Sequence, residues 1–296
     1  MPRLVRARLF VVGLGVVALS SLLVAQPAER VLYVSALDAK TRKPVDTLAV
    51  GDLRVTEDGV VREVLRVTPA TTPMPVAVLV DNQAAMQPAI ADIRGALTAF
   101  LAGIDGLGPV ALVTTADRPT ILQDYTTDAA RLRDAANRIF AMPDSGATTL
   151  DAIVEVSRGL GKRESDRAAM VLVTPELTEF STLHYSQVLD SLEASGAMMS
   201  AVVLLNMRGS IDDDASRNRA VILDRGVKES GGWREDVLTS ISYKQALEQI
   251  AAVLTHQYRV VYARPQTLIP PERVSVEASR DNLLVAGAPA RGQKER

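Results

Sequence analysis

The sequence contains no cysteine, and this absence excludes disulfide frameworks, thiolate zinc sites, iron–sulfur clusters and cysteine nucleophiles. Only 4% of its 296 residues are aromatic, and its 33 basic residues are slightly outnumbered by 35 acidic ones. A net charge of −2 lacks the strong basicity of a nucleic-acid-binding surface, so we expect no nucleic-acid partner. Hydrophobic residues nevertheless make up 47% of the chain, which is typical of a folded protein and excludes a disordered or fibrous one.

An uncharged stretch lies near the N-terminus. Three arginines within the first eight residues precede a run of about 16 uncharged residues, 9–24, and Ala25-Gln26-Pro27-Ala28 follows it. A basic segment, an apolar run and small residues before a proline are typical of an export signal. We therefore predict a signal peptide over residues 1–25, with an uncleaved anchor as the alternative. Both alternatives place the rest of the chain outside the cytoplasm, in the periplasm or secreted, and limit membrane contact to this segment.

A small β module is expected next, over residues 31–68. Residues 31–37 alternate with the period of a strand, and Asp58-Gly59 lies between two further alternating segments, 52–56 and 60–67. Asp-Gly in this setting predicts a hairpin, because both turn positions must accept a positive φ. Residues 68–75 then contain three prolines in eight residues, which favours an extended connector and a domain boundary.

The pattern changes after this connector. Short unbroken apolar runs at 76–80, 110–114, 169–174 and 199–205 are separated by segments of helical period. Strands without alternation are buried on both faces, and helices must cover those faces. The sequence therefore predicts a doubly wound, mostly parallel α/β sheet over residues 75–263, which residues 257–262 close. Residues 264–296 are expected to hold one more strand at 273–278 and a disordered tail from Ala286.

Three segments in a fixed order carry a resemblance to a known family. Pro75-Val-Ala-Val-Leu-Val-Asp81, Gly146-Ala-Thr-Thr-Leu-Asp-Ala-Ile153 and Met170-Val-Leu-Val-Thr174 resemble segments of von Willebrand factor type A (VWA, or VWFA) domains. More narrowly, the chain is similar to a bacterial exported subgroup in which a small β module precedes the VWA domain. The resemblance covers about residues 31–278 and implies the Rossmann-like α/β fold of that family.

The resemblance also implies a site, the metal-ion-dependent adhesion site at the carboxyl ends of the strands. Family members place Asp-x-Ser-x-Ser after the first strand, a threonine in a Gly-x-Thr loop and an aspartate at the end of a later strand. Oxygen atoms at this spacing suit a small hard cation such as Mg²⁺. A carboxylate of the protein partner then fills an open coordination position in such proteins.

This chain departs from the pattern at three of the five positions. Asp81 and Thr148 match it and are the candidate metal ligands. The other positions hold Gln83, Ala85 and Pro175, the last followed by Glu176. Because alanine and proline side chains offer no oxygen, we expect a degenerate site and no bound cofactor. The structural alternative is that Asp81 accepts turn amides and that Thr148 caps the next helix.

We therefore expect an exported, non-enzymatic protein-binding or adhesion element whose partner contacts a rim formed by Asp81, Gln83, Thr148 and Glu176. The alternative is a scaffold subunit of a cell-envelope assembly with a vestigial site. A hydrolase is the third possibility, although the chain has only two histidines, His184 and His256, and lacks the Gly-x-Ser-x-Gly elbow. Its catalytic acids would have to be brought together by folding.

Overall fold

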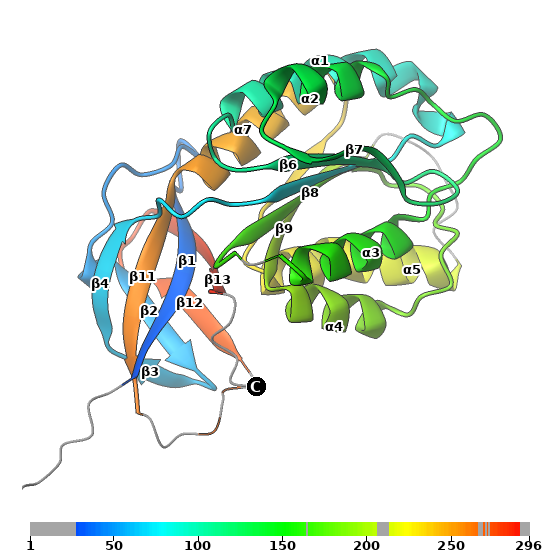
Figure 1. Cartoon of the computed structure of the whole chain (residues 1–296). Coiled ribbons are helices and arrows are strands. Elements are labelled where there is room, and N and C mark those ends of the chain that lie inside the picture. Colours follow the sequence, from blue (N-terminus) through cyan, green and yellow to red (C-terminus); the bar gives the residue numbers. More distant parts are fainter. Residues whose placement is uncertain are drawn as a thin grey trace, which may run out of the picture.

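The structure is a computed structural model that describes residues 28–163, 165–205, 213–265, 269, 271 and 273–290. The predicted signal peptide or anchor, residues 1–25, lies outside the described residues. Two units are visible: a sheet with helices on both faces, and beside it a unit built on antiparallel strands (Figure 1). In the part of the chain that the structure describes, no helix is long and apolar enough to span a bilayer.

The larger unit is built on a six-stranded sheet of order β10-β9-β8-β5-β6-β7. Its strands are β5 (Val76–Val80), β6 (Val110–Thr114), β7 (Thr120–Thr126), β8 (Ala168–Pro175), β9 (Ala197–Leu204) and β10 (Arg234–Val237). All neighbours pair in parallel except β6 and β7. Every residue of β5, β6, β8 and β9 is buried, as unbroken apolar runs predict. The doubly wound α/β fold is confirmed.

Helices cover both faces of this sheet. One face carries α1 (Ile90–Gly103), α2 (Ala129–Asn137) and α7 (Tyr243–Thr255), and the other carries α3 (Thr149–Gly161), α4 (Tyr185–Ser195) and α5 (Asp214–Val221) (Figure 1). Shorter helical segments are the 3-10 turns Val50–Asp52, Ala84–Ala89 and Ser240–Ser242, the π-helical turn Ile222–Gly226 and α6 (Val227–Glu229). The N-cap of α2 is Asp128, whose carboxylate accepts the amides of Ala130 and Arg131.

The smaller unit packs two antiparallel sheets, β13-β1-β11-β4 and β12-β2-β3, around one apolar core. Its strands are β1 (Ala28–Asp38), β2 (Leu53–Glu57), β3 (Val60–Arg62), β4 (Val64–Pro69), β11 (Gln257–Arg264), β12 (Val274–Ala278) and β13 (Leu283–Pro289). The Asp58-Gly59 hairpin is present, with φ of 48° and 81° at its two turn residues.

Three sequence expectations differ from the structure in this unit. The strand at 257–262 does not close the parallel sheet, because β11 lies between β1 and β4. The β module is thus assembled from both ends of the described chain, and the expected limits 31–68 and 75–263 do not separate the two units. Residues 286–289, expected to belong to a disordered tail, instead form the end of β13 against β1, and residues 291–296 lie outside the described residues. A Cβ at Gly287 would lie 2.8 Å from Val276 Cγ1, so a residue without a side chain lets this strand approach its neighbours.

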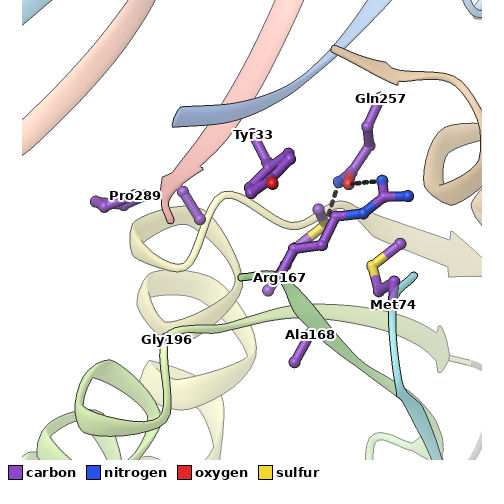
Figure 2. A pocket seen from close by; sticks show the side chains of 9 residues that line it. Tyr33, Met74, Arg167, Ala168, Gly196, Gln257 and Pro289 are labelled. Atoms are coloured by element: carbon purple, nitrogen blue, oxygen red, sulfur yellow. Dashed lines mark hydrogen bonds between the residues drawn. The ribbon is translucent and has the colours of Figure 1, made fainter. Parts of the chain in front are cut away.

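A buried arginine joins the two units. Arg167, just before β8, donates from Nε to the carbonyl of Thr72, at 2.7 Å, and from Nη1 to Gln257 Oε1 at 3.0 Å. Gln257 opens β11, so these bonds tie the parallel sheet to the β module, and Figure 2 shows the bond between Arg167 and Gln257. The cavity beside them has a volume of only about 10 Å³. Such a space holds one water molecule at most, which makes the junction a structural contact and not a ligand site.

Candidate functional site

Asp81 lies directly after the central strand β5, and its side chain is 0% exposed. Its Oδ1 accepts the backbone amide of Gln83 at 3.1 Å, and its Oδ2 accepts Gln83 Nε2 at 3.0 Å. The hydroxyl of Thr174, near the end of β8, donates to the same Oδ2 at 3.1 Å. Folding therefore brings Asp81 and Gln83 together and buries both side chains.

A buried arginine stands beside Asp81. Arg219 comes from α5, is 2% exposed, and places Nη2 at 4.0 Å from Asp81 Oδ2. The same Nη2 donates to Thr174 Oγ1 at 2.5 Å and to the carbonyl of Pro175, while Nη1 donates to the carbonyl of Leu177 at 2.7 Å. The guanidinium thus neutralises the carboxylate and binds the chain where β8 ends.

A second buried acid completes this cluster. Glu179 lies in the loop after β8, with Oε2 at 3.8 Å from Arg219 Nε. Its Oε1 faces the first turn of α3 and accepts the amide of Leu150 at 3.5 Å. Burial raises the pKa of Glu179 to about 7, against the opposing effect of the Arg219 charge. The carboxyl group therefore changes its charge near neutral pH.

The other two predicted rim residues, Thr148 and Glu176, are partly exposed. The Thr148 hydroxyl makes no cap for α3 and donates instead to the carbonyl of Thr115 at 2.9 Å. Since the amide of Thr115 in turn donates to the carbonyl of Val80, at 3.1 Å, Thr148 lies at the same end of the sheet as Asp81. The backbone amide of Glu176 donates to the carbonyl of Leu204. We call this end of the sheet the carboxyl edge.

A divalent cation does not fit these residues while Arg219 occupies the cluster. Alanine and proline at positions 85 and 175 offer no side-chain oxygen, and the positive guanidinium of Arg219 lies within 4.0 Å of the only matching carboxylate. A metal ion beside Asp81 would face that charge at close range in a buried site, where Coulomb repulsion is strong. Among the described residues, no group of three or more His, Asp and Glu side chains is arranged to hold a metal ion.

Sequence reasoning missed Arg219 and Glu179. One weak signal for Arg219 was present: in a helix, Ser216, Arg219 and Leu223 fall on one face, and all three are buried. Glu179 lies in a loop without period, three residues beyond the predicted Glu176. We find no sequence signal that would have identified it.

Large apolar side chains are exposed at the carboxyl edge. Phe140 and Phe180 are 59% and 63% exposed, and Met142, Leu238 and Ile241 are exposed as well. The loop of Phe140 is held beside the Asp81 loop, because Asn82 Nδ2 donates to the carbonyl of Phe140 at 2.9 Å. The ring of Phe180 rests on the backbone of Gly146, where an added Cβ would fall 2.2 Å from the ring. The loops around the buried cluster thus keep both aromatic side chains exposed to solvent.

A second cavity lies away from this edge. It has a volume of about 310 Å³ and is lined by the C-terminal turn of α1, the start of β6 and the first turn of α2. Its walls include Leu101, Ile104 and Leu132, with Asp105 and Arg133 among the polar residues. It lies at the end of β6 opposite the carboxyl edge, and Asp81 is not one of its lining residues.

Comparison with known proteins gives the fold. No protein-family model matches the chain, and no curated protein matches its sequence. Among solved structures, a von Willebrand factor type A protein from Catenulispora acidiphila matches with a TM-score of 0.51 and 8% identity, over 90% of this chain and 72% of that one. Proximal thread matrix protein 1 from the mussel byssus matches with a TM-score of 0.50 and 12% identity, over 72% of this chain and 51% of that one.

An aerotolerance-related membrane protein from Bacteroides fragilis also matches, with 16% identity and a TM-score of 0.47, over 60% of this chain and 98% of that one. The sheet order, the helices on both faces and the likeness to the Catenulispora structure define the class: the chain has the VWA fold. At such low identities the likeness concerns the fold alone.

Proposed function

We propose that this protein is an exported, non-enzymatic VWA-fold element that binds a protein partner at its carboxyl edge without a metal ion. One observation carries the proposal: Asp81 and Gln83, two of the four residues expected to meet a partner, are buried beside Arg219, whereas Phe140 and Phe180 are 59% and 63% exposed at the same edge. Export is inferred from the sequence of residues 1–25.

The chemistry of the partner follows from this arrangement. Asp81 and Gln83 bind each other and are covered, so neither is free to recognise a partner through hydrogen bonds. Exposed aromatic and methionine side chains favour an apolar contact, because aromatic residues and methionine are enriched at protein interfaces. A partner without a coordinating carboxylate therefore suits this edge, in contrast to the metal-bridged recognition that the family resemblance implies.

Hydrolysis is less well supported. Asp81 and Glu179 are two acids that folding brings to one cluster, and both are buried against Arg219, where a substrate would not reach them. The two histidines belong to different helices: His184 is the N-cap of α4, and His256 follows the last residue of α7. A turnover of esterase, glycosidase or phosphatase substrates that survives repurification of the exported protein would overturn the non-enzymatic assignment.

The binding proposal is tested by site-specific photo-crosslinking in the full chain, expressed in the cell that produces it. A photoreactive residue at position 180 should capture a partner, and the substitutions Phe140→Ser and Phe180→Ser together should remove that partner from the purified complex. The matched control is Val60→Ser with Val61→Ser on β3, since Val61 is 61% exposed but belongs to the β module.

The outcomes separate the alternatives. Loss of the partner in the edge variant, with retention in the β3 variant, supports the carboxyl edge. The reverse result favours the scaffold alternative, in which the β module makes the contacts. If the partner is retained in both variants, the proposed edge does not bind it.

A further inference from the structure

The guanidinium of Arg219 is surrounded by oxygen atoms. Those within 4.0 Å of its nitrogens are Asp81 Oδ2, Thr174 Oγ1, the carbonyls of Pro175 and Leu177, and Glu179 Oε2. Carboxylates, hydroxyls and carbonyls are the ligands of hard divalent cations. These oxygen atoms form a site for a positive charge, and the guanidinium of Arg219 occupies it.

Two of these oxygens belong to positions that the family pattern uses. Asp81 is the first position of the pattern, and residue 175, where the pattern has an aspartate, contributes its backbone carbonyl instead. The change from aspartate to proline removes one negative charge at the place where a singly charged arginine replaces a doubly charged ion. The lost aspartate charge therefore matches the lower positive charge of Arg219, so the cluster stays balanced in charge.

The helix that carries Arg219 is fixed independently of this contact. The Ser216 hydroxyl, one turn earlier on α5, donates to Asp213 Oδ2 at 2.8 Å and accepts the amide of Glu179 at 3.3 Å. α5 is thereby attached to the loop after β8 even without the guanidinium. Directly after α5 the helix widens into the π-helical turn Ile222–Gly226, a local change of geometry often found at functional sites.

We infer that Arg219 is a tethered cation that replaces the dissociable metal ion of the VWA fold and joins α5 permanently to the ends of β5 and β8. The carboxyl edge is then held in one state whatever the concentration of divalent cations. This inference concerns the buried cluster only, and it stands or falls independently of whether a partner binds the edge.

Thermal unfolding of the full chain with and without Mg²⁺, Mn²⁺ and Ca²⁺ tests it. The midpoint of the wild-type protein should not respond to these ions beyond the effect of NaCl at equal ionic strength. Arg219→Ala should lower the midpoint by about 10 °C, because two buried carboxyl groups lose their counter-charge. A divalent cation should then raise the midpoint of this variant in a saturable way, since the oxygen ligands remain and the guanidinium is gone.

Two further variants make the result specific. Arg219→Ala combined with Asp81→Asn should not respond to the ions, because it lacks the central carboxylate. Arg217→Ala removes an exposed arginine two residues away on the same helix and should behave as wild type.

If Arg219→Ala does not fold, a double-mutant cycle between Arg219→Met and Asp81→Asn replaces it. A double variant that is more stable than the sum of the two single losses predicts supports the charge compensation. A saturable response of the wild-type protein to a divalent cation, a folded Arg219→Ala variant that no cation stabilises, or strict additivity in the cycle would each overturn the inference.

Discussion

The buried carboxyl group of Glu179 makes the stability of this protein depend on pH, and Glu179→Gln isolates that dependence. Burial raises the pKa of Glu179 from 4.5 to about 7 in the folded state. Between these values the unfolded chain has released its proton while the folded chain still holds it. Rising pH therefore favours the unfolded state, and the free energy of unfolding falls.

The size of the effect follows from the same two values. A separation of the pKa from 4.5 to about 7 corresponds to a loss of about 3 kcal/mol, at ~1.4 kcal/mol for each tenfold change in proton affinity. The charged and titratable groups near this carboxyl are Arg219, which lowers its pKa, and Asp81, which raises it. Tyr243 lies near the same two groups, and burial raises its pKa further above neutrality, so it does not titrate in this window.

Urea unfolding at pH 5, 6, 7 and 8 measures this difference. The Glu179→Gln variant has no proton to lose, so its stability relative to wild type should increase from pH 5 to pH 7 and then level off. Glu176→Gln is the matched control, because Glu176 is partly exposed and lies three residues earlier in the same loop. A stability difference between wild type and Glu179→Gln that stays constant across this range refutes the proposed burial of a protonated carboxyl group.

Three further predictions concern the framework, and urea unfolding at pH 7 checks each of them. Gly231→Ala should destabilise the protein by about 3 kcal/mol, because Gly231 has φ of 76° and an added Cβ would lie 2.3 Å from the Gly287 carbonyl carbon; an effect under 1 kcal/mol would contradict this close approach. Arg167→Met keeps the apolar stem but leaves the Thr72 carbonyl and the Gln257 amide oxygen unpaired, so we expect a loss of about 3 kcal/mol; a neutral result would mean that the junction does not depend on these bonds. Asp128→Ala should cost only about 1 kcal/mol, since it removes one exposed N-cap, and Asp128→Asn should restore most of it.

The β module shows how far local pattern predicts pairing. The Asp58-Gly59 turn was predictable because its two residues set the backbone geometry of the hairpin by themselves. The partners of β11 were not, because alternation identifies a strand but its backbone groups pair equally well with any other strand. β11 and β1 are separated by more than 200 residues, and only folding brings Val261 opposite Val31.

The candidate site divides in the same way. The sequence by itself determined the α/β sheet and the position of Asp81 after its central strand, because unbroken apolar runs identify strands that are buried on both faces. It also determined the mismatches at Ala85 and Pro175, because the residue type alone shows that a side-chain oxygen is missing. Only the tertiary structure decided that Arg219 and Glu179 complete the cluster. An arginine or a glutamate is expected to be exposed to solvent. It is stable in a buried position only where distant elements supply the opposite charge, as β5, β8 and α5 do here.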